Sequence, residues 1–476
     1  MNFRDILSLP SIPYILLGIG AMLAAAVLRR MAPCFYHLAR TSVSLLDIYL
    51  QPGSEDEKLP QIEKGTQELL FSLLRVIGAL LLALALGALL PYLYTLLPRF
   101  NPPFAPDEAW SILAVSLGAT LPFLWPAGKP ASGYPPLAQL LHHLALDNPH
   151  LGRRLLGGEI KQAARQGLER REDFLIITGL ARAGTTSFLN ALLPRGPFAS
   201  LDYGHMPFLL SPRRWARLYR PKGEDLKERS HGDGVRIGLR SSEALEEYFW
   251  QSQAGTEYIW PGGLKEYELS EQQYQEYLDY QRVVRQRPEQ IYVAKNNNFL
   301  LRYRSVRARN PHFRAVILFR APLYQAASLR EKHRQYVELQ TQDPFVETYM
   351  SWLGHYEFGR QQRPFLFSST PEPVQAVLDA GERDELDYWL AVWIAVYGFA
   401  AELEHEQTYF VAYEDFCARP EAVLGAVLTG WPGAEGGAAV SPHQNNRAVA
   451  ERPSSALLER AEEIYEKLRE KQISGL

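Results

Sequence analysis

The sequence predicts an α/β fold, with a P-loop-like, mainly parallel sheet flanked by helices, preceded by an α-helical transmembrane region. The first observation is uneven charge: Asp, Glu, Lys and Arg make up 19 of the first 150 residues but 84 of the remaining 326. The second is that short apolar runs alternate with longer helical stretches after residue 150, which is typical of a parallel sheet with crossover helices. We therefore expect a membrane region over 1–128, a linker over 129–150 and a cytoplasmic domain over 151–476.

The first 128 residues contain three stretches without Asp, Glu, Lys or Arg, which are Ile6–Leu28, Val76–Pro98 and Ala109–Gly128. A helix rises about 1.5 Å per residue, so each stretch is long enough to cross a hydrocarbon core of roughly 30 Å. Pro10 and Pro13 shorten the first stretch and Pro122 interrupts the third. We expect about three transmembrane helices, with interfacial or re-entrant segments as the alternative for the outer two.

The positions of the basic residues predict the orientation in the membrane. Arg29 and Arg30 follow the first apolar stretch, and the loop 29–68 is richer in Lys and Arg than the loop 99–108. By the positive-inside rule this places loop 29–68, and everything after Lys129, in the cytoplasm. The expected location is the inner (cytoplasmic) membrane, multi-pass. The alternative for the first stretch is a cleavable signal peptide, and residues 31–50 could form an amphipathic surface helix.

A segment rich in Pro and Gly over 126–136 marks the expected linker. After it, four short apolar runs predict buried strands over 174–178, 291–294, 315–319 and 409–413. Longer stretches between and after them predict helices over 242–252, 271–285, 321–340, 385–405 and 454–471. This order of elements supports the α/β prediction.

The composition argues against nucleic-acid binding, disulfide bonds and cysteine-based metal sites. The 50 Lys and Arg against 53 Asp and Glu give a net charge of −3, whereas nucleic-acid binding requires an excess of basic residues. The two cysteines, Cys34 and Cys417, lie far apart in the chain. We expect isolated thiols in a reducing compartment, with neither a disulfide nor a cysteine-based metal site.

The first predicted strand is followed by a glycine-containing loop with the sequence Gly-Leu-Ala-Arg-Ala-Gly-Thr-Thr-Ser over 179–187. A strand, a Gly-x4-Gly loop and a helix N-terminus together direct backbone N–H groups at an anion. A tight turn with hydroxyls capping the helix is the structural alternative. Thr185 stands where a Walker A loop has its lysine, so a nucleoside triphosphate with magnesium fits poorly.

At this loop the sequence resembles bacterial-type, membrane-anchored sulfotransferases that use 3′-phosphoadenosine 5′-phosphosulfate (PAPS). Their 5′-phosphosulfate loop has the form Pro-Lys/Arg-Ser-Gly-Thr-Thr, and residues 181–186 are Ala-Arg-Ala-Gly-Thr-Thr. The family's second signature is a strand ending in Arg with a Ser eight residues later, which together hold the 3′-phosphate. Arg320 and Ser328 have this spacing, with Ala321 replacing the common Asp.

The resemblance covers most of residues 174–470 and includes a late Tyr-Glu-Asp segment that begins at Tyr413. It implies a sulfotransferase fold, PAPS as the sulfuryl donor and no metal. Bacterial members often carry Lys followed by Pro and His before the second signature, and this chain has Lys295 without either. The implied nucleotide-binding residues are Arg182, Ala183, Gly184, Thr185, Thr186, Ser187, Arg320 and Ser328.

Sulfuryl transfer requires a group that neutralises charge on the leaving phosphate oxygen and a base that takes the acceptor's proton. Arg182, Lys295 and the backbone N–H groups of 183–187 are candidates for the first role. Glu246 and Glu247 are the first choice for the base, with His231, Glu243 and His205 behind them. The alternatives are an exposed acidic helix face for the glutamates and a hydrogen-bonded loop residue for His231. Asp233 is expected to stabilise a turn.

Two functions from different classes follow. The first is a membrane-anchored, PAPS-dependent sulfotransferase acting on a lipid, a lipid-linked glycan or a polysaccharide, with the bilayer and that acceptor as partners. The second is a non-catalytic membrane assembly protein that retains a nucleotide-binding fold. A P-loop kinase is disfavoured because the Walker lysine is missing. A homodimer is compatible with the sequence, and nucleic acid is not an expected partner.

Overall fold

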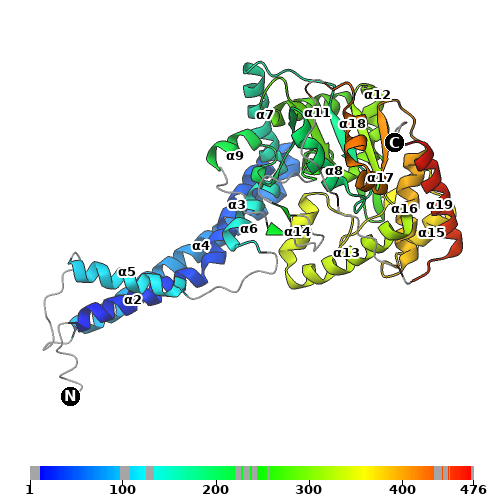
Figure 1. The fold of residues 1–476 in the computed structure, drawn as a ribbon. Helices are drawn as coiled ribbons and strands as arrows, with labels where there is room; N and C mark the ends of the chain where they lie inside the picture. Colours follow the sequence, from blue (N-terminus) through cyan, green and yellow to red (C-terminus); the bar gives the residue numbers. More distant parts are fainter. Residues whose placement is uncertain are drawn as a thin grey trace. The chain divides into compact units, whose positions relative to one another are not determined.

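The fold is that of a computed structural model, which describes residues 11–96, 108–124, 133–219, 227–228, 236–237, 244–255, 257–431, 433, 442, 449 and 451–472. Two compact units divide the chain, Met1–Leu151 and Gly152–Leu476. Figure 1 shows the first unit as helices and the second as a sheet covered by helices. The parallel sheet flanked by helices that the sequence predicts is confirmed.

The apolar stretches of the first unit form helices, which are α2 (Ile12–Arg30), α4 (Glu55–Thr95) and α5 (Ala109–Leu124). By length and composition, α2 and α4 are able to cross a membrane, whereas α5 has only 16 residues. The described residues thus contain two helices long and apolar enough to span a membrane, where we expected about three. Leu81 and Leu84 of α4 are 61% and 69% exposed, as expected of side chains that face lipid.

Small residues bring the apolar helices of the first unit into close contact. A Cβ atom built on Gly118 of α5 would lie 2.0 Å from the carbonyl oxygen of Gly18 in α2. A Cβ on Gly20 would lie 2.3 Å from the carbonyl oxygen of Gly87 in α4. Such close backbone approach through small residues is typical of helices that pack in a membrane.

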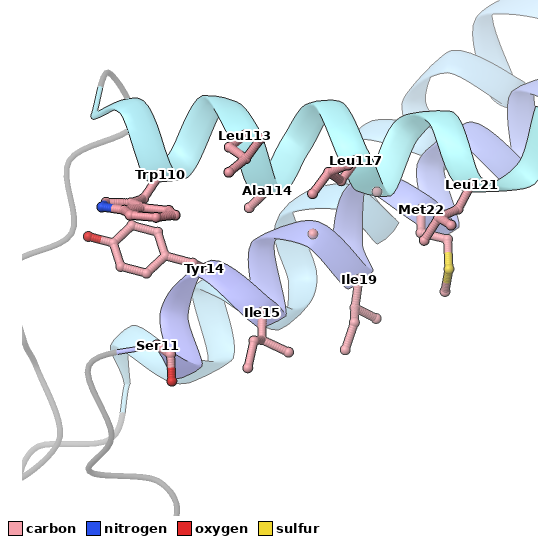
Figure 2. Close-up of a pocket in the computed structure, with 12 residues that line it drawn as sticks. Ser11, Tyr14, Ile15, Ile19, Met22, Trp110, Leu113, Ala114, Leu117 and Leu121 are labelled. Atoms are coloured by element: carbon pink, nitrogen blue, oxygen red, sulfur yellow. The ribbon is translucent and has the colours of Figure 1, made fainter.

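An apolar groove of about 580 Å³ lies between α2 and α5. Figure 2 shows its wall of aliphatic side chains, with the rings of Tyr14 and Trp110 next to each other at one end. Tyr14 donates a hydrogen bond of 2.7 Å to Glu108. The groove offers apolar surface rather than groups that could bind a phosphate.

Two further helices complete the first unit, α3 (Ala32–Leu50) and α6 (Pro136–Leu146). Helix α3 coincides with the segment in which we expected an amphipathic helix. Helix α6 lies inside the expected linker, because Pro136 can occupy the first turn of a helix and the apolar residues after it continue that helix. The linker prediction was therefore too long at its C-terminal end.

The second unit contains a five-stranded parallel sheet in the order β10-β8-β1-β7-β2. Its strands are β1 (Leu175–Thr178), β2 (Phe198–Ala199), β7 (Ile291–Lys295), β8 (Arg314–Phe319) and β10 (Thr408–Ala412). Four of these strands are the four predicted apolar runs, with ends that differ by one residue or less. The edge strand β2 has only two residues, too few to show a periodicity.

Helices cover both faces of this sheet. On one face, α8 (Thr185–Leu192), α17 (Tyr413–Ala418) and α18 (Pro420–Leu428) pack on alternate residues of the longer strands. On the other face, Phe319 of β8 contacts Tyr397 of α16 (Leu386–Ala401) and Tyr465 of α19 (Ser455–Glu470). Helices α16 and α19 lie side by side (Figure 1). The sheet is thus the middle of three layers.

The predicted helices 271–285, 321–340, 385–405 and 454–471 are present as α11 (Glu271–Val284), α13 (Pro322–Gln342), α16 and α19. The predicted helix 242–252 corresponds to α10 (Glu247–Ala254), and the first two residues of the predicted range lie outside the described residues. The other helices of the second unit and its start are α7 (Pro149–Arg165), α9 (Pro212–Leu218), α12 (Tyr303–Arg309), α14 (Pro344–Trp352) and α15 (Glu372–Ala380), with the 3-10 turns η1 (Leu193–Arg195), η2 (Tyr203–His205) and η3 (Asn297–Arg302). Two small sheets join β3 (Lys227–Glu228) with β4 (Arg236–Ile237), and β5 (Ile259–Trp260) with β6 (Gly263–Lys265) and β9 (Phe365–Leu366).

Candidate phosphate-binding site

The candidate site lies at the carboxyl edge of the parallel sheet. Because β1, β7, β8 and β10 are parallel, their carboxyl ends meet at one edge, where ligands bind in open α/β sheets. The Gly179 loop follows β1, Lys295 ends β7, Arg320 follows β8 and Tyr413 follows β10. The register pairs Ile177 with Lys295 across two of these strands. Residues more than 230 positions apart in the chain thus lie at one edge of the sheet.

The loop between β1 and α8 depends on two glycines with positive φ. A Cβ on Gly179 (φ +131°) would lie 2.2 Å from the carbonyl oxygen of Leu318, and one on Gly184 (φ +86°) would lie 2.1 Å from the ring of Tyr413. Arg182 also has a positive φ of 70°, which is uncommon for a residue with a side chain and marks local backbone strain. The two glycines suit this conformation, and Arg182 is the residue of the loop that is held in a strained one.

Arg182 connects the two motifs. Its Nε donates a hydrogen bond of 3.1 Å to Ser328 Oγ on α13. Arg320, at the end of β8, is only 6% exposed. Burial lowers the pKa of Arg320, and the nearby Arg182 guanidinium lowers it further, whereas Glu414 and Tyr413 raise it. Two guanidinium groups close enough to repel each other concentrate positive charge, which favours binding of an anion.

Lys295 joins the same cluster from β7. Its ammonium group donates a hydrogen bond of 2.9 Å to Thr186 Oγ1 in the first turn of α8. The N–H groups of that first turn have no partner within the helix, by the geometry of any α-helix. Lys295 thus stands beside the end of α8 that carries a partial positive charge.

The C-terminal segment that begins at Tyr413 supports the site in a way that sequence reasoning missed. Tyr413 is the first residue of α17 rather than the last of a strand, and its ring packs against Gly184. Glu414 Oε1 accepts a hydrogen bond of 3.0 Å from the backbone N–H of Ala321, before the first turn of α13. A carboxylate from this segment therefore binds the turn in which the resembled family commonly has Asp.

Glu246 and Glu247, our first choice for the base, belong to a buried polar network, so the alternative of an exposed acidic helix face is wrong. Each is only 2% exposed. Glu246 accepts hydrogen bonds from Tyr277, Tyr292 and Asn296. Burial raises the pKa of Glu246, although these bonds favour its charged form.

Glu247 is bound on both carboxylate oxygens. The Arg302 guanidinium donates to Oε2 at 2.6 Å and to Oε1 at 2.8 Å, and Tyr258 donates to Oε1 as well. Asn296 donates to both glutamates, at 2.8 Å to Glu246 and 2.9 Å to Glu247. Both carboxylates thus accept a hydrogen bond from Asn296, the neighbour of Lys295. Each of their oxygens already accepts at least one hydrogen bond from the protein. This arrangement favours a positioning role over that of a base open to an acceptor.

Of the remaining candidates for the base, His205 lies within the described residues and the others do not. His231 and Glu243 lie outside the described residues, as does Asp233, which we expected to stabilise a turn. His205 lies in η2, after the edge strand β2, where Nδ1 is 2.7 Å from Asp202 Oδ1. None of the contacts found among the described residues links His205 to the Gly179 loop.

The side chains gathered at this edge are suited to a ligand with several negative charges. Arg182, Lys295, Arg320, Thr186 and Ser328 are all hydrogen-bond donors, and the first turn of α8 adds N–H groups. Such a donor set is suited to binding the oxygen atoms of phosphate groups.

Among solved structures, the chain is similar to the crystal structure of the sulfotransferase STF1 from Mycobacterium tuberculosis H37Rv. The two are 16% identical, and the match covers 80% of this chain and 96% of that chain with a TM-score of 0.35. At this identity and TM-score, the similarity supports no statement about what this chain does. No protein-family model and no curated protein sequence matches the chain.

Proposed function

We propose that this chain is a membrane-anchored sulfotransferase that moves a sulfuryl group from PAPS to a hydroxyl or amine of a lipid, a lipid-linked glycan or a polysaccharide. The observation that carries the proposal is the 3.1 Å hydrogen bond from Arg182 to Ser328. It joins two motifs 146 residues apart that, by resemblance, bind the two phosphorylated ends of one nucleotide. Contact between them is what a single nucleotide site requires.

The proposed chemistry suits the residues at the site. Sulfuryl transfer is an in-line displacement much like phosphoryl transfer, so the protein contributes mainly positioning and charge stabilisation. Arg182, Lys295 and the first turn of α8 would stabilise the negative charge on the leaving phosphate oxygen. Arg320 and Ser328 would hold the 3′-phosphate, where the planar guanidinium can bind two oxygens at once.

The apolar helices support the choice of acceptor and the location. We propose that α2 and α4 anchor the protein in the cytoplasmic membrane, with the second unit in the cytoplasm. Anchoring raises the effective concentration of an enzyme for an acceptor that is itself held in the bilayer. A lipid or lipid-linked glycan is therefore the favoured class.

The alternative is a non-catalytic assembly protein that retains the fold. The strained backbone of Arg182 favours a functional nucleotide site, which both functions share, because such strain costs of order 1–3 kcal/mol and is typically kept where it serves binding or catalysis. Formation of PAP from PAPS distinguishes the two functions.

The test is nucleotide-dependent thermal stability of the full chain in dodecyl maltoside. A ligand that binds the folded state raises the melting temperature. We expect 3′-phosphoadenosine 5′-phosphate (PAP), the product nucleotide, to raise it, and ATP with magnesium to leave it unchanged. Stabilisation by ATP alone would contradict the proposal and favour a kinase. Stabilisation by PAP without formation of PAP from PAPS would favour the non-catalytic alternative.

A further inference from the structure

The loop 353–364, between α14 and β9, presents a histidine–carboxylate pair, His355 and Glu357. His355 Nδ1 lies 3.5 Å from Glu357 Oε1 and 3.4 Å from Oε2. The side chain of His355 is 24% exposed, whereas that of Glu357 is 5% exposed. The carboxylate is therefore internal and the imidazole reaches the surface. Because Nδ1 faces Glu357, Nε2 is the ring atom that can face a ligand.

The loop is bound tightly to the end of β7. Asn297 Nδ2 donates a hydrogen bond of 2.9 Å to Glu357 Oε1, and Asn298 Nδ2 donates one of 2.9 Å to the carbonyl oxygen of Gly354. A Cβ on Gly354 (φ +67°) would lie 2.3 Å from Glu247 Cγ, so the loop lies directly against α10. These contacts position His355 from two sides.

A short chain of contacts leads from His355 to the candidate phosphate loop. Lys295 binds Thr186 at the start of α8, and Asn297 follows Lys295 by two residues. Consecutive Cα atoms are about 3.8 Å apart, so the Cα atoms of Lys295 and Asn297 are separated by at most about 7.6 Å. Asn297 then holds Glu357, and Glu357 faces His355. The pair is thus connected to the end of the strand that supplies Lys295.

The electrostatics of the pair suit a base. Burial alone would raise the pKa of Glu357, but the charge of His355, its hydrogen bond and that of Asn297 lower the pKa to about 2. Glu357 therefore stays ionised at neutral pH, so its carboxylate can accept a hydrogen bond from His355 Nδ1 and orient the ring. Glu357 Oε2 has no hydrogen-bond partner within the described part of the chain. The distances of 3.4–3.5 Å are long for a hydrogen bond, but catalytic hydrogen bonds are often long without substrate and shorten when substrate binds.

We propose that His355 is the general base of the sulfuryl transfer and that Glu357 is its positioning residue; this inference rests on the function proposed above. His355 Nε2 takes the proton of the acceptor hydroxyl or amine while that oxygen or nitrogen forms its bond to sulfur. The bond between sulfur and the bridging oxygen breaks, and its electron pair leaves with the phosphate of PAP. The proton on His355 is then released to solvent.

The first test measures which histidine faces the sulfuryl group, without requiring turnover. Diethyl pyrocarbonate modifies neutral imidazoles, and mass spectrometry of peptides from the full chain in dodecyl maltoside reports each histidine separately. We expect PAPS to slow modification of His355 severalfold, and PAP, which lacks the sulfuryl group, to slow it less. His312, which is exposed and precedes the amino end of β8 at the opposite edge of the sheet, is the control whose reactivity stays constant.

The second test uses variants and measures the PAP formed from PAPS. This measurement detects sulfuryl transfer to any acceptor, including water. His355→Asn should lower kcat by about 10²–10⁴-fold and change the KM for PAPS little, since proton transfer is lost and nucleotide binding is kept. Added imidazole should restore part of the rate to His355→Ala. Glu357→Gln should lower kcat without changing KM. The comparison is His205→Asn, which removes the rival histidine–carboxylate pair and should leave kcat unchanged.

The outcomes separate this inference from the proposed function. If PAP and PAPS both fail to raise the melting temperature, the proposed function is wrong and the inference falls with it. The other case is that PAP and PAPS raise the melting temperature, so the site binds the nucleotide. His355 is then not the base if PAPS leaves its reactivity unchanged, or if His355→Asn keeps the kcat of the natural chain. Retention of the PAP-dependent melting shift in His355→Asn shows that the variant is folded.

Discussion

Arg320 illustrates how a single charged residue can matter at this site. It is almost fully buried, it lies near Arg182, and burial lowers its pKa. Glu414 offsets part of the repulsion between the two guanidinium groups, and a bound anion would offset more of it. We therefore propose that Arg320 is a ligand for phosphate.

We expect Arg320→Ala to weaken the binding of PAP by about 1.5–3 kcal/mol, because a charge-assisted hydrogen bond is lost. This loss raises the Kd for PAP roughly tenfold or more. Arg320→Lys should recover only part of this loss, since an ammonium cannot bind two oxygens in one plane. Titration calorimetry of the full chain in detergent measures both. The control is Arg287→Ala, an exposed residue before the amino end of β7. Unchanged affinity in Arg320→Ala would exclude Arg320 from the site.

At the scale of elements, the loop between β1 and α8 is the most constrained segment of the candidate site. Its shape depends on positive φ at Gly179, Arg182 and Gly184 and on the ring of Tyr413, which comes from α17. The loop and the C-terminal segment thus form one structural unit although they are far apart in the chain. A change in either should affect nucleotide binding.

Gly184→Ala should lower the melting temperature and abolish the PAP-dependent shift, because the new methyl group overlaps the Tyr413 ring and φ is +86°. The matched control is Gly157→Ala on α7, where the added methyl group would have no atom within 4 Å. That substitution should stabilise the chain by up to about 1 kcal/mol, since alanine favours a helix over glycine. A full PAP response in Gly184→Ala would mean that this loop does not hold the nucleotide.

At the scale of the whole molecule, the chain combines a unit of apolar helices with a unit built on a parallel sheet. A net charge near zero does not prevent the second unit from binding a polyanion. Helix N-termini and a few arginines provide positive potential locally, where the strands end. The charge-rich second unit in turn explains why the average composition resembles that of a soluble protein.

We expect the full chain to remain in the membrane pellet after extraction with alkaline carbonate. Leu81→Arg combined with Leu84→Arg should release it or prevent insertion, since each arginine at the centre of a span costs about 2.5–3.5 kcal/mol. Both leucines are exposed on α4. The control is Gln61→Arg with Gln67→Arg, in the polar first half of the same helix. Extraction of the natural chain by carbonate would contradict membrane anchoring.

By itself, the sequence determined the apolar helices, the four longer strands and the spacing of both candidate phosphate-binding motifs, because periodicity and local spacing are properties of short segments. Only the tertiary structure decided that Glu246 and Glu247 are internal, that Tyr413 packs on Gly184, and that His355 faces Glu357 near the end of β7. Burial and partnership depend on segments brought together by the parallel sheet. In the sequence, two glutamates at the start of a helix are typical of an exposed pair. The tyrosines, arginine and asparagine that surround them come from other segments and are brought there by the fold.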